Sequence, residues 1–381
     1  MNKILLFSSN YEDGWYYKDG AQLILNLKKC GLIPEILTFN YKNSFPITEK
    51  EINVRKVNPK KFIWGNLSLV FFFLKNARKT KVFMAFHLNF RSLFPVFIYK
   101  VLNPKGFAYI KMDNNHNAIA KYPWENVWLN RIFFWDVRNY LMKHVFIKKV
   151  DLFSIEDDLS KTYFEEKYSF LKNRLILLYN GFTVNADEIK ISPWSEKTNY
   201  ILSAARFGIP EKATDILLEA FAKTKDKHNW KLVLCGTVDV SFKKSVEDYY
   251  VKYPDLKERV IFKGHLNRSE LFNFYRISKI FVLPSRSEGF PNVISDALIF
   301  SNAIITTNVV AMNRRIKDKM GIIINPDNVD ELEKAFMMLI EDEEKAKKFG
   351  EEGFTFAKNN LNWKSNCDFL YNEMIKKGLK N

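Results

Sequence analysis

Cysteine, glycine, proline and long apolar runs are all scarce in this chain of 381 residues, which has 3 Cys, 14 Gly and 12 Pro. Cys30, Cys235 and Cys367 stand far apart and form no CxxC pair. The sequence therefore offers neither a disulfide framework nor a zinc site, and it fits a reducing compartment.

The longest uninterrupted apolar run, Leu69 to Leu74, is far shorter than the roughly 20 residues that cross a bilayer. The apolar run from residue 4 to residue 7 is too short for a signal peptide and reads as a buried strand ending at Ser8. We predict a cytoplasmic protein that does not span a membrane.

The remaining composition is that of a folded protein. Hydrophobic residues make up 47% of the chain, and no low-complexity tract interrupts it. At a soft prior of about 150 residues per domain, the length predicts two globular units.

Positive charge is concentrated in one part of the chain. The net charge is +16, and residues 51–150 hold 18 Lys and Arg against 4 Asp and Glu. The same hundred residues are rich in large aromatic side chains: Phe62, Trp64, Phe71, Phe72, Phe73, Phe90, Phe94, Phe97, Tyr99, Trp124, Trp128, Phe133, Phe134 and Trp135. Cations interleaved with Trp and Phe suit the surface of an anionic bilayer, so we predict a peripheral membrane-docking face. The alternative is an aromatic core with a solvated cationic rim. We predict no nucleic-acid partner, because the chain has no RNA or DNA motif.

Short apolar runs alternate with helical-period stretches, which predicts an α/β fold with parallel sheets. The first series of expected strands is Lys3 to Phe7, Glu35 to Thr38, Val82 to Phe86, Ala108 to Lys111, Leu152 to Ile155 and Leu175 to Leu178. The second series is Tyr200 to Ala204, Lys231 to Cys235, Val260 to Phe262, Ile280 to Leu283, Ala303 to Thr306 and Gly321 to Ile324. The clearest expected helices are Asp215 to Thr224 and Asp330 to Glu341. The polar segment 188–198 reads as a linker. We therefore predict Rossmann-like domains at 1–187 and 188–365 that face each other across a cleft, and a final helix, 366–381, that packs back on the first domain.

The strongest chemical signal runs from Leu283 to Ala297, with the sequence LPSRSEGFPNVISDA. It follows an expected buried strand and opens a helix. Gly289 allows a sharp turn, and the free amides at the helix start favour anions. Glu288 and Asp296 are eight residues apart and can bracket one ligand. The alternative is that Glu288 caps the helix and Asp296 is a solvated helix residue.

This stretch resembles the EGxP and E-x7-E signature of the family 4 retaining glycosyltransferases, which are group 1 enzymes with the GT-B fold. The segments Ser203 to Phe207 and Glu211 to Phe221 resemble that family's strand, diphosphate-binding Arg and Lys, and first helix. Asn180 to Phe182 resembles the Asn-Gly at the end of its first domain. Three further segments fall at the expected intervals: Leu234 to Gly236, Phe262 to Gly264 and Gly321 to Ile324. The resemblance is specific over about residues 175–340 and only topological before them.

The resemblance implies a role for each matching residue. Arg206 and Lys212 would hold the diphosphate, whose negative charge grows as the donor bond breaks, and would replace a metal. Glu288 would bind the donor sugar. The loop residues Gly289, Phe290, Pro291 and Asn292 would face sugar and phosphate. Asp296 would hold the ribose.

Several positions depart from the family pattern. The second carboxylate is usually Glu, and Asp296 is one methylene shorter. The family's glycine-rich turn after the next strand is replaced by Asn308 to Ala311, which puts the contacts of that loop in doubt. No DxD pair stands at a strand end, and Asp157-Asp158 reads as a helix start. We expect neither a metal nor another cofactor.

In the first domain the family has a glycine loop and a His at a strand end. Gly20 is the candidate for the loop and a further donor contact. The His position aligns with Asp113, and His116 and His87 are the other candidates. Such a group could polarise the acceptor hydroxyl or support the positive charge that develops on the sugar.

The predicted function is transfer of a sugar, with retention, from a nucleotide-diphosphate sugar to a saccharide acceptor. A UDP-sugar is favoured over a GDP-sugar. The basic first domain suggests a lipid-linked acceptor in surface polysaccharide biosynthesis at the inner face of the cell membrane. The alternatives are a nucleotide-sugar epimerase or a phosphorylase of the same fold, and a non-catalytic polyanion-binding protein.

Overall fold

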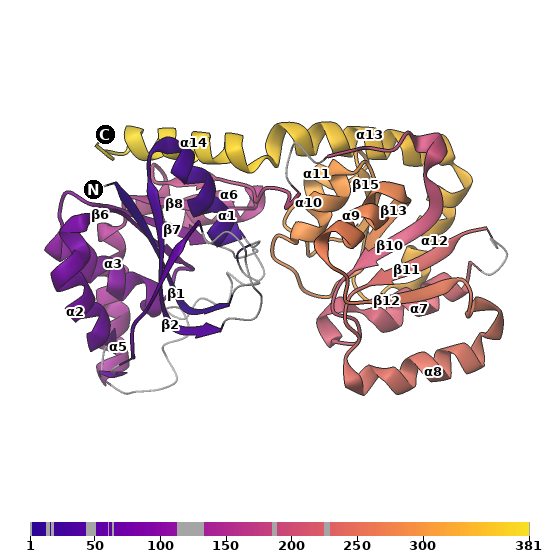
Figure 1. Ribbon diagram of the computed structural model, residues 1–381, viewed down its shortest axis with the longest axis horizontal. Coiled ribbons are helices and arrows are strands. Elements are labelled where there is room, and N and C mark those ends of the chain that lie inside the picture. The colour runs from indigo at the N-terminus through magenta and orange to yellow at the C-terminus, as the bar shows by residue number, and fades with distance from the viewer. Residues whose placement is uncertain are drawn as a thin grey trace. The chain divides into compact units, whose positions relative to one another are not determined.

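The computed structural model describes residues 2–12, 16, 19–42, 51–59, 61–62, 65–112, 133–184, 189–224 and 229–380. The chain divides into two compact units, unit 1 (Met1–Asn180 and Trp363–Asn381) and unit 2 (Gly181–Asn362) (Figure 1). The division falls at Gly181 rather than at residue 188. The reason is that Phe182 already belongs to unit 2, where its amide donates a 2.8 Å hydrogen bond to the carbonyl of Leu361.

Unit 1 is built on a parallel sheet of seven strands in the order β3-β2-β1-β6-β7-β8-β9. Its strands are β1 (Lys3–Glu12), β2 (Ile33–Lys42), β3 (Asn53–Lys56), β6 (Thr80–Phe86), β7 (Phe107–Met112), β8 (Leu152–Ile155) and β9 (Leu175–Leu177). The short strands β4 (Lys61–Phe62) and β5 (Gly65–Asn66) form a separate antiparallel pair. Strands alternate their side chains between the two faces of a sheet. Thus Ile4 and Leu6 pack on one face of the sheet, and Leu5 and Phe7 on the other.

Helices cover both faces of this sheet. The unit 1 helices are α1 (Asp19–Leu27), α2 (Leu67–Asn76), α3 (Phe90–Leu102), α5 (Phe133–Leu141), α6 (Asp158–Lys167) and α14 (Trp363–Lys376). The face of Ile4 and Leu6 is covered by α1 and α14, and the opposite face by α2, α3, α6 and residues 142–150. The last helix of the chain therefore packs on unit 1, where Leu370 joins the core.

Unit 2 repeats the design with six parallel strands in the order β12-β11-β10-β13-β14-β15. They are β10 (Thr198–Ala204), β11 (Lys231–Cys235), β12 (Val260–Gly264), β13 (Ser278–Leu283), β14 (Ala303–Thr307) and β15 (Gly321–Ile324). The helices are α7 (Thr214–Ala222), α8 (Lys243–Lys252), α9 (Arg268–Ile277), α10 (Asn292–Ile299), α11 (Asn313–Ile316), α12 (Val329–Glu341) and α13 (Glu343–Asn360). One face packs against α7 and α12 in a core that includes Phe221 and Phe336.

Each sheet has a point where the strand order reverses. In unit 1 it lies between β1 and β6, and in unit 2 between β10 and β13. Ligands of open α/β sheets bind outside the carboxyl ends of the strands at such points. The two places where chemistry is expected are therefore fixed by topology.

All the predicted strands form, but one expected strand end in the first unit was wrong and one strand of its sheet was missed. Strand β1 does not end at Ser8 and continues to Glu12, because residues 10–12 keep pairing with residues 40–42 of β2. Strand β3 was not predicted, since its four residues are mostly polar and carry no apolar run. In the parts of the chain that the structure describes, no helix combines the length and the apolar character that crossing a membrane requires.

Candidate active site

The loop after β10 carries two of the predicted binding residues. Arg206 is exposed just beyond the strand, and Lys212 ends a short 3-10 turn, Pro210–Lys212, before α7. The loop turns at Gly208, whose φ of +87° would strain any side chain. The Gly208 amide donates a 2.8 Å hydrogen bond to Thr214 Oγ1, which closes the loop on α7. Both cations thus lie beyond the carboxyl end of β10.

Lys212 and Glu288 form an ion pair between two loops. Glu288 follows β13, which neighbours β10 in the sheet. The side chains are 21% and 11% exposed, so both are partly open to solvent. Glu288 Oε1 also accepts a 2.7 Å hydrogen bond from the buried hydroxyl of Ser285. The predicted phosphate-binding lysine and sugar-binding glutamate therefore meet at the reversal point of the unit 2 sheet.

Arg286 fastens the two loops together. Its amide donates to the carbonyl of Glu211 at 2.9 Å, and its Nη1 donates to the carbonyl of Pro210 at 2.7 Å. Its Nη2 pairs with Asp215 at 2.7 Å and its Nε with Asp327 at 2.5 Å. The hydrogen bond to Asp215 above all, and the contact with Asp327, raise the pKa of the guanidinium against the lowering effect of burial. Sequence reasoning missed Arg286, although it lies inside the predicted motif.

The residues after Glu288 lead into α10. Phe290 and Pro291 are buried, and the carbonyl of Gly289 accepts a 3.1 Å hydrogen bond from the amide of Ala311. The loop that replaces the expected glycine-rich turn therefore supports this segment. Asn292 begins the helix, and its Oδ1 is buried without a hydrogen bond from the described residues. A buried polar atom of this kind is stabilised when a ligand supplies the missing donor.

Asp296 has different partners from Glu288. Its two carboxylate oxygens accept hydrogen bonds from the amide and hydroxyl of Thr183, at 2.6 and 2.7 Å. Arg268 donates to the carbonyl of Thr183. Burial raises the pKa of the Asp296 carboxyl to about 6, against the lowering effect of the Thr183 hydrogen bonds and of Arg268. The residue is buried and not solvated, and it anchors the start of unit 2. A ribose contact by Asp296 stays a prediction.

A family comparison bears on this arrangement. Residues 184–356 match the model of the family described as glycosyl transferases group 1. This segment is a group 1 glycosyl transferase domain. It contains Arg206, Lys212, Glu288 and the whole loop from residue 289 to residue 292.

Individual proteins are similar to the chain over different lengths. An uncharacterized glycosyltransferase of Methanocaldococcus jannaschii is 32% identical and aligns with 49% of this chain and 50% of its own. The N-acetylgalactosamine-N,N'-diacetylbacillosaminyl-diphospho-undecaprenol 4-alpha-N-acetylgalactosaminyltransferase of Campylobacter jejuni is 24% identical, over 51% of this chain and 52% of its own. The chain spans about half the length of three curated relatives.

A solved structure extends the likeness to the whole chain. Anabaena HepE in complex with UDP has a TM-score of 0.75 and 13% sequence identity, covering 99% of this chain and 100% of its own. Such a likeness concerns the fold alone. It confirms the predicted α/β class and the GT-B fold, to which the group 1 glycosyl transferase domain contributes the second sheet.

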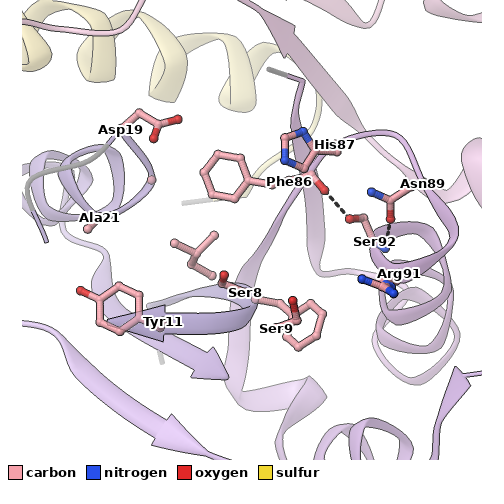
Figure 2. A pocket seen from close by; sticks show the side chains of 13 residues that line it. Ser8, Ser9, Tyr11, Asp19, Ala21, Phe86, His87, Asn89, Arg91 and Ser92 are labelled. Carbon is pink, nitrogen blue, oxygen red and sulfur yellow. Dashed lines mark hydrogen bonds between the residues drawn. The ribbon is translucent and has the colours of Figure 1, made fainter. Parts of the chain in front are cut away.

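Outside the group 1 glycosyl transferase domain, unit 1 has a cavity of about 460 Å³ beside the second half of β1, the start of α1 and the end of β6 (Figure 2). Gly20 lines it from the first turn of α1, and a Cβ there would lie 2.6 Å from the ring of Phe86. His87 lines it too, with a φ of +60° at the end of β6. The candidates Asp113 and His116 lie outside the described residues. Donor binding by Gly20 stays a prediction, because close packing against Phe86 already accounts for the missing side chain.

Proposed function

We propose that this chain is a retaining glycosyltransferase of the family 4 type, which transfers a sugar from a nucleotide-diphosphate sugar to a saccharide acceptor. The observation that carries the proposal is the pairing of Lys212 with Glu288 at the reversal point of the unit 2 sheet. The pair lies inside a group 1 glycosyl transferase domain, so a cation for phosphate and a carboxylate for sugar hydroxyls stand side by side. HepE, which has the same fold, was crystallised with UDP, and this favours a UDP-sugar donor.

The pair explains how the site could accept a donor. Without donor, Lys212 and Glu288 satisfy each other's charge. A diphosphate then takes the place of Glu288 beside Lys212, and the carboxylate becomes available to accept hydrogen bonds from the sugar hydroxyls. Ser285 keeps the carboxylate oriented during this exchange, through its 2.7 Å hydrogen bond. Arg286 keeps the two loops at a fixed spacing.

In the transfer step, the bond between the anomeric carbon and the phosphate oxygen breaks. The acceptor oxygen then bonds to the same face of that carbon. The acceptor hydroxyl proton passes to the leaving diphosphate. Lys212 and Arg206 stabilise the negative charge that develops there, as fixed cations do for leaving groups. Since these cations carry the neutralisation, we propose that the reaction needs no divalent metal.

We further propose that the acceptor is a lipid-linked saccharide, in the synthesis of a surface polysaccharide at the inner membrane face. The Campylobacter jejuni relative supports this, because its name specifies a saccharide on diphospho-undecaprenol as acceptor. The second support is the surface of unit 1. Residues 52–112 hold 12 Lys and Arg and neither Asp nor Glu, although Lys111 is buried and does not contribute to this surface.

Helix α2 presents the apolar part of that surface. Phe71 and Leu74 are 57% and 60% exposed, and Lys75, Arg78 and Lys79 follow them on the exposed side. We call these five residues the α2 face. Six described aromatics of residues 51–150 are buried in the core instead, in line with the sequence alternative: Phe73, Phe83, Tyr99, Phe107, Tyr109 and Phe146. The docking proposal therefore rests on the α2 face and not on aromatic content as such.

A screen of nucleotide-sugars by thermal unfolding tests the donor site. A ligand at 100 times its Kd stabilises the native state by about 2.7 kcal/mol, which corresponds to several degrees in Tm for a unit of this size. We expect one diphosphate-sugar to stabilise the wild type, and neither Glu288→Ala nor Arg206→Ala to respond to it. Glu219→Gln, in the exposed pair of Lys252 with Glu219, is the matched control and should respond as the wild type does.

A second readout tests whether the transfer proceeds with retention of configuration. The anomer of the product, measured by NMR, should match that of the donor. If no nucleotide-sugar and neither UDP nor GDP stabilised the wild type, the transferase assignment would have to be abandoned.

A further inference from the structure

Arg286 joins three loops at the carboxyl edge of the unit 2 sheet. It lies in the loop after β13, and its amide and Nη1 donate to the carbonyls of Glu211 and Pro210 in the loop after β10. Its Nη2 lies 2.7 Å from Asp215 at the start of α7, and its Nε lies 2.5 Å from Asp327, which follows β15. We call these five residues the Arg286 clamp. The clamp connects loops that are 41 to 76 residues apart in the chain.

The clamp borders both residues that the proposed function assigns to the donor. Lys212 comes directly after Glu211, and Glu288 lies two residues after Arg286. The ion pair of Lys212 with Glu288 joins the same two loops. The clamp therefore fixes the backbone beside each member of that pair.

The backbone at two points of the clamp has a conformation that non-glycine residues seldom adopt. Ala213, directly after Lys212, has a φ of +48°, and Asp327 has a φ of +59°. Residues stay in this left-handed region only where the surrounding contacts over-determine the backbone, and they cluster at functional sites. Asp327 has such a contact in its ion pair with Arg286, and Ala213 is fully buried. The loops are thus held in one arrangement against a local conformational cost.

Arg286 itself is poorly suited to bind phosphate. Each of its three side-chain nitrogens already donates a hydrogen bond within the clamp, and the carboxylates of Asp215 and Asp327 face its single positive charge. Burial alone would raise the pKa of the Asp215 carboxyl, but the hydrogen bond and the charge of Arg286 lower it, so this carboxylate is ionised at neutral pH. A cation that two carboxylates offset exerts little attraction on a diphosphate.

We infer that Arg286 is a positioning residue for the proposed transfer: the Arg286 clamp holds Lys212 where the leaving diphosphate gains charge, and Arg286 does not contact the donor. The inference rests on the proposed function and extends its site to the loop after β15. Fixed groups stabilise a developing charge without having to reorganise during the reaction. A shift of about 1 Å in such a group can cost about 100-fold in rate.

A double-mutant cycle tests whether Arg286 acts through Lys212. Hydrolysis of a UDP-sugar that stabilises the wild type serves as the assay, because it needs the donor site but no acceptor. Arg286→Lys keeps the charge but loses the planar fork that reaches three partners. We expect it to lower kcat by about 10- to 100-fold, the range for lost hydrogen bonds to charged groups. The donor KM should rise less than kcat falls, because the charge on the diphosphate grows only as the bond breaks.

The double variant decides how Arg286 acts. Lys212→Met with Arg286→Lys should be nearly as active as Lys212→Met alone, since a clamp has no effect on a side chain that is absent. Losses that multiply would show that Arg286 acts on the donor independently of Lys212. That result would overturn the inference.

Replacing the carboxylates of the clamp tests the same point with the opposite change of charge. Asp215→Asn and Asp327→Asn each make the site more positive. If Arg286 bound phosphate, either change would free its guanidinium and tighten the binding of UDP. We expect instead that each lowers kcat by about tenfold, through loss of one charged hydrogen bond, and does not tighten UDP binding. Isothermal titration calorimetry measures the Kd for UDP.

Asp330→Asn is the matched control, because it removes a carboxylate from the exposed pair with Lys223 in the same unit. It should change neither kcat nor the Kd for UDP. Tighter UDP binding in Asp215→Asn or Asp327→Asn than in this control would identify Arg286 as a phosphate ligand and overturn the inference.

Thermal unfolding establishes that each variant is folded. Asp215 and Asp327 are 55% and 57% exposed, so their asparagine variants carry the test if Arg286→Lys does not fold. Unchanged kcat in all three single variants would overturn the inference and leave the donor site as proposed. A wild type that neither binds nor hydrolyses any nucleotide-sugar would instead remove the proposed function itself.

Discussion

Each unit has a lysine–glutamate pair at the carboxyl edge of its sheet, and the two pairs differ in burial. Lys111 and Glu156 of unit 1 are 0% and 5% exposed, whereas Lys212 and Glu288 of unit 2 are 21% and 11% exposed. Desolvation makes the first pair depend on both partners, because either charge alone in the interior is costly. The second pair remains within reach of a ligand. The same two residue types thus form a sealed pair in unit 1 and a partly exposed pair in unit 2, and in the proposed function only the second exchanges with a ligand.

The units also differ in how their charge is distributed over the chain. Unit 1 holds 32 Lys and Arg against 17 Asp and Glu, and unit 2 holds 27 against 26. Nearly all the net charge of +16 therefore belongs to unit 1. A balanced unit suits a small donor that needs a few local cations, and a strongly basic one suits an extended anionic surface.

The largest effect is expected when the buried pair is broken. Lys111→Met leaves Glu156 unpaired in the interior and should lower the free energy of unfolding of unit 1 by about 3–5 kcal/mol. The double variant Lys111→Met with Glu156→Leu should regain most of this loss, since apolar residues replace both charges. Urea unfolding followed by circular dichroism measures both. Lys161→Met in the surface pair with Glu165 is the control, with an expected change below about 0.5 kcal/mol. If the Lys111→Met variant were as stable as the wild type, the buried pair would not depend on both of its charges, and the proposed difference between the two pairs would be wrong.

The partly exposed pair of Lys212 and Glu288 should behave in the opposite way. Lys212→Met should lower kcat/KM by about 100- to 1000-fold, as loss of one fixed group that stabilises developing charge does. The free energy of unfolding should change by less than about 1 kcal/mol, because the pair is partly solvated. Steady-state kinetics and urea unfolding of the same preparation give both numbers. Lys223→Met, in the surface pair with Asp330, supplies the comparison. A stability loss as large as that of Lys111→Met would show that Lys212 is structural.

The sequence predicted the sheets and the main loops, because apolar runs mark buried strands and glycines mark the turns between them. It also brought Lys212 and Glu288 to notice through a family motif, although 76 residues separate them. Their contact follows from topology, since β10 and β13 are neighbours in a sheet that reverses between them.

Contacts between distant polar residues could not be read in the same way. Lys111 ends the apolar strand that we predicted and resembles an ordinary strand-end lysine. Nothing near it in the sequence indicates that it contacts Asp19 or Glu156. Asp296 likewise finds Thr183 at a distance of 113 residues. Both side chains are buried and hold distant segments together. Their burial depends on how the whole unit packs, so it could not be inferred from the neighbouring sequence. Arg286 was missed for a related reason, because its partners lie in three separate segments.

The smallest expected effect is on membrane binding by the α2 face. This binding should depend on the positive net charge of unit 1, which unit 2 lacks. We expect the wild type to co-sediment at low salt with vesicles that contain phosphatidylglycerol. Phe71→Ser with Leu74→Ser should weaken this binding by about tenfold, because two exposed apolar side chains no longer enter the interface. Val240 and Val251 are even more exposed, at 79% and 81%, but they lie in the charge-balanced unit 2. Their replacement by serine should leave vesicle binding unchanged.

Equal losses in both double variants would mean that apolar exposure alone drives adsorption. No binding by the wild type would remove the membrane from the proposal and leave the donor site as it stands.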